Sequence, residues 1–303
     1  MSESLLTPAF FASLAIAVGL AAGLTAHAMR TLAADSPSRR HRALRIAIAA
    51  AALGTVGVAV GEPGRIAAMQ CVVAGLLGFL AAAIATDWDC YLIPDSVALT
   101  GTVAGVTAMA AVGSPLHPLH AKLRPTADGW ITAAPEWTAA HPHWHGLAVA
   151  VAGGLTGLLA TLALRAIASA AMGREAMGTG DATLMMMAGT ILGWQGSLLA
   201  LLAAPLVGLA AALIVWATTR RVFVAFGPYL AVSSWQLLAT WSDLWGVDRP
   251  TTVAQVFADL PLVAGTVVFI LGGTGGLLWL SRRMRGEATQ ESDTNRRKRR
   301  RKR

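Results

Sequence analysis

Residues 66–95 read IAAMQCVVAGLLGFLAAAIATDWDCYLIPD, and this stretch decides the fold class. The run from Ile66 to Thr86 holds no charged side chain. A helix of about 20 apolar residues spans the hydrocarbon core of a bilayer, so the run predicts a transmembrane helix. Asp87 follows at once. Because a carboxylate beside hydrocarbon is costly to ionise, an acid at such a boundary indicates a functional position.

Further apolar runs of similar length occur along the rest of the chain. Hydrophobic residues make up 55% of the 303 residues and charged residues 13%, against about 25% charged in a typical soluble domain. The composition predicts an all-α fold, a polytopic transmembrane bundle of about 8–9 spanning helices. A short apolar stretch, Ala182–Gly193, predicts either a short span or a re-entrant segment. The clearer spans are expected at Ala9–Met29, Leu44–Val60, Ile66–Thr86, Ile93–Val112, Leu147–Met172, Leu198–Thr218, Val222–Trp241 and Leu260–Leu280.

The distribution of Lys and Arg predicts which loops lie inside. With the N-terminus outside and Ala182–Gly193 crossing, 20 of the 24 basic residues fall on the inner side, as the positive-inside rule requires. The same topology places Asp87 at the inner end of one helix and Asp181 at the inner start of another. We therefore expect an outside N-terminus, a cytoplasmic C-terminus, and both aspartates at the cytoplasmic face.

Asp181 closes the sequence Gly178-Thr179-Gly180-Asp181. A helix that enters and ends at Asp87 and a helix that leaves from Asp181 can bring the two acids together. Two adjacent carboxylates do not both ionise cheaply, so one keeps a proton. The pair can then supply a general base and a general acid for peptide hydrolysis, with no metal and no cofactor. Gly178 and Gly180 carry no Cβ, so the backbone can turn tightly and a substrate strand can approach Asp181.

Four motifs in one order resemble the type IV prepilin peptidase (leader peptidase) family over roughly residues 70–240. They are Asp87-x7-Asp95 with Ile93-Pro94-Asp95, the segment 174–184 around Asp181, Leu192-Gly193-Trp194, and Phe226-Gly227-Pro228-Tyr229. The resemblance implies that Asp87 and Asp181 are the catalytic pair. It also implies a multi-pass protein of the bacterial inner (plasma) membrane that removes the basic leader from prepilins or pseudopilins at the cytoplasmic face.

Two features depart from that family. Its bifunctional members carry paired CxxC motifs and methylate the new N-terminus, whereas residues 1–65 here contain no cysteine. N-methyltransferase activity is therefore not expected. The family also often has Lys two residues after the second aspartate, where this chain has Thr183.

Three further acids have alternative interpretations. Asp95 follows Pro94 at the start of an apolar run, so it either caps the helix or contacts substrate. Glu175 either orients substrate or is simply solvated. Asp89 is expected in a short polar inner loop, with no direct role in the chemistry.

The pattern divides the chain into four parts. Residues 1–65 predict two helices of unassigned role, and residues 66–242 predict the catalytic membrane domain, with an external insertion at 113–146. That insertion holds five of the seven histidines, and we interpret it as an interfacial segment rather than a metal site. Residues 243–281 predict an external loop and a last helix. Residues 282–303 form a basic tail, expected to bind anionic membrane lipids and not nucleic acid.

Two other functions fit parts of the pattern. An intramembrane protease of the presenilin or signal-peptide-peptidase type shares the GxGD motif, but it cuts within a transmembrane segment. A proton-coupled transporter also uses buried acids, although such proteins often show internal repeats with broken helices. The Ile93-Pro94-Asp95 and Phe226-Gly227-Pro228-Tyr229 motifs, with both aspartates at helix ends, favour the prepilin peptidase over the intramembrane protease. Proton flux in liposomes without cleavage would favour the transporter.

Overall fold

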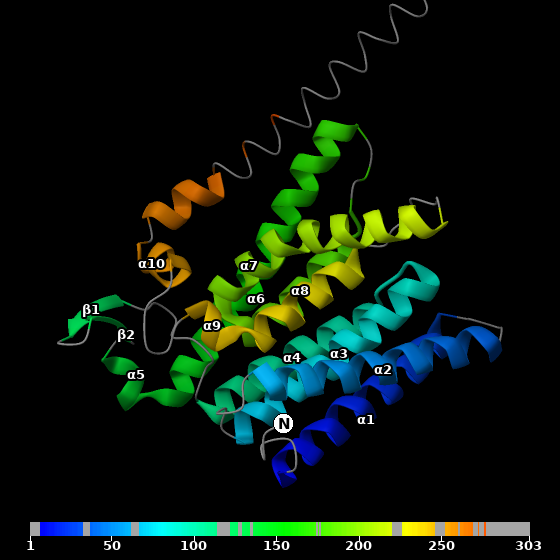
Figure 1. Ribbon diagram of the computed structural model, residues 1–303, viewed down its shortest axis with the longest axis horizontal. Helices are drawn as coiled ribbons and strands as arrows, with labels where there is room; N and C mark the ends of the chain where they lie inside the picture. Colours follow the sequence, from blue (N-terminus) through cyan, green and yellow to red (C-terminus); the bar gives the residue numbers. More distant parts are fainter. Residues whose placement is uncertain are drawn as a thin grey trace, which may run out of the picture.

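The computed structural model describes residues 7–32, 37–61, 67–113, 122–126, 129–133, 136–173, 175, 177–219, 226–245, 252–259, 261–268, 272 and 276. These residues form helices joined by short connections, with one small hairpin (Figure 1). In chain order the elements are α1 Pro8–Thr31, α2 Pro37–Gly61, α3 Ala67–Cys90, α4 Asp95–Val112, β1 Lys122–Thr126, β2 Gly129–Ala133, α5 Trp137–Ala140, α6 Pro142–Met172, α7 Thr179–Thr219, α8 Gly227–Ala239, α9 Trp241–Trp245 and α10 Thr252–Ala258.

The prediction of an all-α transmembrane bundle is confirmed. Within the described residues, six helices are long and apolar enough to cross a membrane, namely α1, α2, α3, α4, α6 and α7. The expected span Val222–Trp241 is shorter than predicted: α8 has 13 residues, which rise about 20 Å against a hydrocarbon core of about 30 Å. Most of the expected span Leu260–Leu280 and the basic tail lie outside the described residues. The insertion contains an antiparallel pair, β1 with β2, which the sequence did not predict.

Helix α7 contains a break at Gly193. This residue has φ 69° and ψ 178°, a left-handed conformation that glycine adopts without steric cost. The break divides α7 into a first arm, residues 179–192, and a second arm, residues 194–219. The first arm corresponds to the short segment that the sequence predicted up to Gly193.

Packing contacts show that the second arm of α7 returns toward the start of the first. A Cβ on Gly180, in the first arm, would lie 3.2 Å from Ile93 Cβ, and a Cβ on Gly227 would lie 2.8 Å from Ile93 Cδ1. In the second arm, a Cβ on Gly208 would lie 3.3 Å from the Tyr229 ring, two residues beyond Gly227. The two arms are therefore antiparallel, and Gly193 lies at the opposite end from Gly180.

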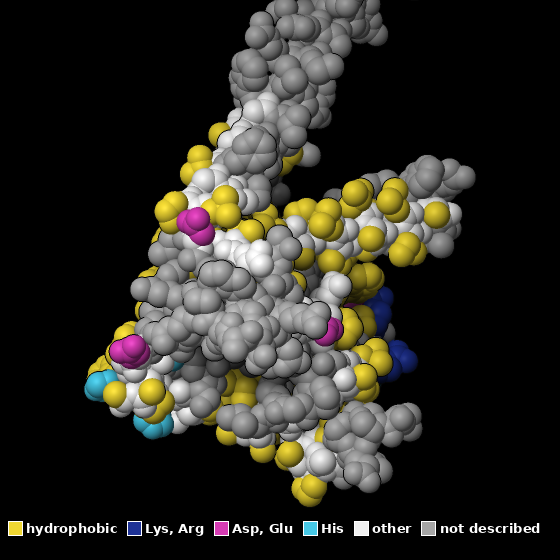
Figure 2. Space-filling view, turned by 60° about the vertical axis from the view of Figure 1, so that its left-hand side comes forward, with side chains coloured by type: hydrophobic (Ala, Val, Ile, Leu, Met, Phe, Trp, Pro, Cys, Tyr) yellow, Lys and Arg dark blue, Asp and Glu magenta, His cyan; other side chains and the backbone are white. Residues whose placement is uncertain are grey.

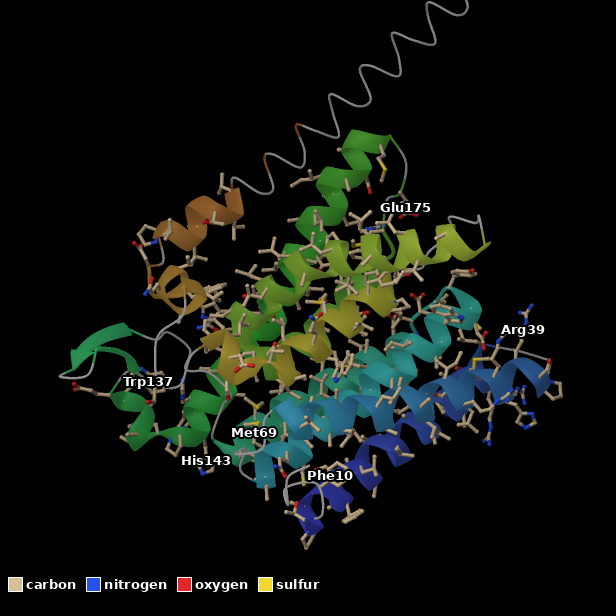
Figure 3. The ribbon with its side chains drawn as sticks, viewed as in Figure 1. Phe10, Arg39, Met69, Trp137, His143 and Glu175 are labelled. Carbon is tan, nitrogen blue, oxygen red and sulfur yellow. The ribbon has the colours of Figure 1, made fainter. Side chains whose placement is uncertain are left out.

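The helix termini fall at two ends of the bundle (Figure 3). Arg39 near the start of α2 and Glu175 just before α7 lie toward one end, which also holds the C-terminus of α3. Phe10, Met69 and His143, near the starts of α1, α3 and α6, lie toward the other. We call the first the aspartate end and the second the histidine end. The alternation of chain direction agrees with the predicted topology for the described helices.

Small residues allow the helices to pack closely. A Cβ on Gly78 of α3 would lie 2.8 Å from Leu20 Cβ of α1, and Ala17 of α1 is fully buried at the same contact. Between α6 and α7, Gly153 packs directly on Gly189, and Ser197 Oγ donates to the Gly153 carbonyl oxygen at 3.1 Å. Apolar burial supplies little association energy in lipid, so such close backbone packing is what holds a membrane bundle together.

Candidate active site

Asp87 and Asp181 lie on neighbouring helix ends. Asp87 is in the last turn of α3 and Asp181 is in the first turn of α7. Their exposed fractions are only 7% and 8%. The backbone N–H of Gly227 donates to the Asp87 carboxylate, the N–H of Gly178 donates to the Asp181 carboxylate, and the two acids interact electrostatically. The structure thus brings together the two aspartates that the sequence singled out.

The start of α8 closes one side of this pair. A Cβ on Gly227 would lie 2.6 Å from Asp87 Oδ2, closer than real Cβ atoms approach. Only glycine allows the backbone of α8 to reach the carboxylate and donate to it. Sequence reasoning noted Gly227 as part of a motif but assigned it no contact. Its place between an aromatic residue and Pro228, directly before a helix, was the available signal.

The two glycines before Asp181 have different surroundings. A Cβ on Gly180 would lie 3.2 Å from Ile93 Cβ and 3.4 Å from the Ile93 carbonyl oxygen. A methyl group at position 180 would therefore require Ile93, in the α3–α4 connection, to move by a few tenths of an ångström. A Cβ on Gly178 would meet nothing nearer than Asp181 Oδ2 at 3.9 Å. Gly178 leaves open space beside the carboxylate rather than relieving a clash.

Glu175 lies in the connection between α6 and α7. Its side chain is 80% exposed and pairs with Arg165 of α6, which also donates from Nε to the Met177 carbonyl oxygen at 2.8 Å. Arg165 thereby ties the segment before Gly178 to α6. Sequence reasoning counted Arg165 only as an inner-loop charge, although an arginine inside a long apolar helix was a visible signal. The neighbouring Arg174 lies outside the described residues.

Asp95 is not the N-cap of α4. The N-cap residue is the buried Pro94, which has extended backbone and forms no side-chain capping bond. Asp95 is one residue further on, exposed in the first turn, so the capping prediction was wrong. At that position its carboxylate still faces the positive end of the helix dipole. Whether it contacts substrate stays a prediction.

Asp89 lies within α3 and not in a solvated loop, so that expectation was wrong. Its side chain is fully buried, and Arg42 Nε of α2 donates to Oδ1 at 2.7 Å. Asp89 lies two residues after Asp87, but its carboxylate contacts Arg42 of α2. Thr183, where the family often has Lys, donates from its hydroxyl to the Gly180 carbonyl oxygen at 3.0 Å.

The histidines of the insertion lie far from this pair. His143 Nδ1 lies 2.9 Å from the Ala110 carbonyl oxygen, and the buried His145 packs edge-on against Trp137. In the part of the chain that the structure describes, no group of three His, Cys, Asp or Glu side chains is placed to hold a metal ion. His117 and His120 lie outside the described residues.

Comparison with known families identifies the segment that contains both acids. The model of the type IV leader peptidase family matches residues 74–213. Residues 74–213 belong to the type IV leader peptidase family. The matched segment begins within α3 and ends within the second arm of α7, so α1, α2 and α8 lie outside it. Comparison with curated proteins and with solved structures gives no significant match. The protein is therefore a leader-peptidase-like membrane protease.

Proposed function

We propose that this protein is an aspartic endopeptidase that removes the basic leader from type IV prepilins or pseudopilins. The observation that carries the proposal is the meeting of Asp87 and Asp181, both buried, at one end of the bundle. Each comes from a different helix and each accepts a backbone N–H from a glycine. The family assignment of residues 74–213 supports the same chemistry.

Hydrolysis then needs only the two carboxyl groups and one water molecule. The ionised aspartate takes a proton from the water as its oxygen attacks the scissile carbonyl carbon. The protonated aspartate donates its proton to the carbonyl oxygen, which gives a tetrahedral intermediate with two hydroxyl groups. The first aspartate, now protonated, gives its proton to the amine nitrogen as the carbon–nitrogen bond breaks, and the second aspartate takes a proton from one of the hydroxyl groups. The products are a carboxyl terminus on the leader and a free amine on the mature subunit. The close-packed protein around the pair excludes bulk water and strengthens these interactions.

The distribution of charge supports cleavage at the cytoplasmic face. At the aspartate end, the described basic residues include Arg39, Arg42 and Arg165, whereas Lys122 and Arg124 belong to the hairpin of the insertion. In Figure 2 the visible Lys and Arg side chains gather at one edge of the molecule. Under the positive-inside rule, the aspartate end faces the cytoplasm. This orientation is part of the proposal, as is an anionic-lipid contact of the tail 282–303.

Co-expression with a pilin precursor tests the proposal. Asp87→Asn and Asp181→Asn should each reduce leader removal by about 10³-fold or more, because the amide neither accepts nor supplies the required proton. The matched control is Asp243→Asn, an exposed acid in α9 whose neighbours Trp241 and Trp245 pack against Gly196 and Phe257, near the Gly193 break. It should retain wild-type cleavage. Cleavage that survives either first substitution, in protein that inserts normally, would overturn the proposal.

A further inference from the structure

A cavity lies one helical turn from the aspartate pair. Its volume is about 230 Å³, and it is lined by α2, α3 and α8. Ile84, on its α3 wall, comes three residues before Asp87, and Ala231, on its α8 wall, comes four residues after Gly227. Residues three or four apart share a helix face. One end of the cavity therefore lies on the helix faces that carry Asp87 and Gly227.

The walls of the cavity are hydrocarbon. Its side chains include Ala50 and Leu53 from α2, Leu80 from α3, and Trp235 from α8. The indole Nε1 of Trp235 donates to the Gly54 carbonyl oxygen at 3.1 Å, so the polar group of this aromatic is already bonded. A polar occupant would lose its hydrogen bonds with water and gain few in return. The site suits an apolar side chain.

Helix α2 forms one wall of the cavity and is bonded to its neighbours at two points. Arg42 ties it to Asp89 of α3 near the aspartate end, and the bond from Trp235 to Gly54 ties it to α8 further along. Leu53, on the rim, is 69% exposed, so the cavity opens toward the lipid. An apolar segment that lies in the bilayer can therefore reach it from the side. A second cavity of about 250 Å³, between α7 and residues 253–267, lies near the Gly193 break and away from the acids.

We infer that this cavity receives apolar side chains from the membrane segment of the substrate, on the side of the scissile bond that stays in the membrane. The inference rests on the proposed function. A precursor with a basic leader followed by a long apolar helix places the leader in water and the helix in the bilayer. With its scissile bond at Asp87 and Asp181, that helix continues along α3 and α8, where the cavity lies. Helix α2, outside the matched family segment, thereby acquires a role in substrate binding.

Filling the cavity tests the inference. Ala50→Leu places a larger side chain in it, whereas the neighbouring Ala49 is exposed on the same helix and does not line it. For each variant, kcat/KM is measured on a precursor with its full apolar segment and on a peptide that ends just after the scissile bond. The ratio of the two values should fall about tenfold in Ala50→Leu, the effect of displacing one buried apolar side chain. In Ala49→Leu it should equal the wild-type ratio.

Photo-crosslinking tests the same contact without filling the cavity. A photoreactive aromatic residue at Leu53 should capture the apolar segment of the precursor in the Asp181→Asn background. The same residue at Val56, exposed on α2 outside the cavity lining, should capture lipid instead. Equal ratios in Ala50→Leu and Ala49→Leu, or capture of phospholipid alone at Leu53, would overturn the inference while leaving the proposed function intact. Failure of the wild-type enzyme to cut any precursor would instead remove the proposed function.

Discussion

The last turn of α3 carries two acids with different surroundings, Asp87 on the face toward α7 and α8, and Asp89 on the face toward α2. Both are buried. Asp89 forms an ion pair with Arg42, and this ion pair joins α3 to α2. Among the described residues Asp87 forms no ion pair, and its neighbours are a glycine N–H and a second carboxylate. Burial alone therefore does not mark the reactive acid.

The role of a buried acid depends on the group that it contacts. An acid beside a cation stays ionised and contributes to structure. An acid beside another acid shares a proton with it, which is the state that general acid–base catalysis requires. Two positions within one turn of α3 thus carry a structural acid and a reactive acid, and substitutions around Asp87, Asp89 and Asp181 test that difference.

Among substitutions that leave both aspartates in place, Gly227→Ala should have the largest effect on cleavage. The added methyl group would lie 2.6 Å from Asp87 Oδ2, so the carboxylate or the start of α8 has to move. A shift of about 1 Å in a catalytic group can cost roughly 10²-fold in rate, and we expect a loss of that order in kcat/KM. Gly75→Ala, on α3 with open space around the added methyl, is the control and should cleave normally. Normal cleavage by Gly227→Ala would show that α8 does not hold Asp87.

Arg42→Ala should destabilise the fold more than it impairs cleavage. It leaves the buried Asp89 carboxylate without its partner, which lowers the free energy of unfolding. Thermal unfolding in detergent measures the loss. Asp89→Asn should lower the melting temperature less, because the amide oxygen still accepts from Arg42, and it should retain cleavage. If Asp89→Asn abolished cleavage without changing the melting temperature, Asp89 would belong with Asp87.

Gly178→Ala should have the smallest effect. Its added methyl meets only Asp181 Oδ2 at an ordinary contact distance of 3.9 Å, so we expect a change in kcat/KM within about twofold. Gly180→Ala, whose methyl would press on Ile93 at 3.2 Å, should reduce the rate more. The reverse order would mean that Gly178, and not Gly180, sets the position of Asp181.

The sequence predicted the part of the fold that depends on local hydrophobicity. Five of the apolar runs correspond to α1, α2, α3, α4 and α6, and the end of the short segment was placed at Gly193, where α7 breaks. The length of α8 and the hairpin in the insertion were missed. Length alone cannot tell a span from a helix that stops early, and α8 ends at Ala239 with Thr240 in the C-cap position.

For the site, the sequence indicated which acids lie on the same side, because chain direction alternates across a bilayer. It did not indicate which acids are paired. Asp89 pairs with Arg42, which is 47 residues away in the sequence. No local sequence pattern therefore predicts that Asp89 is buried. Asp95 was misplaced by one residue because Pro94 takes the capping position. The close approach of Gly227 depends on tertiary packing, and only the structure shows it.

The most direct test of the central claim is a crosslink between positions 87 and 181. In a background without Cys71 and Cys90, the pair Asp87→Cys and Asp181→Cys should be joined rapidly by a short thiol-specific reagent in native membranes. The pair Asp89→Cys and Asp181→Cys should react much more slowly, because position 89 faces α2. Rapid joining of the first pair alone is the result predicted here. No joining of positions 87 and 181, in protein that is folded and whose cysteines react singly, would contradict the account.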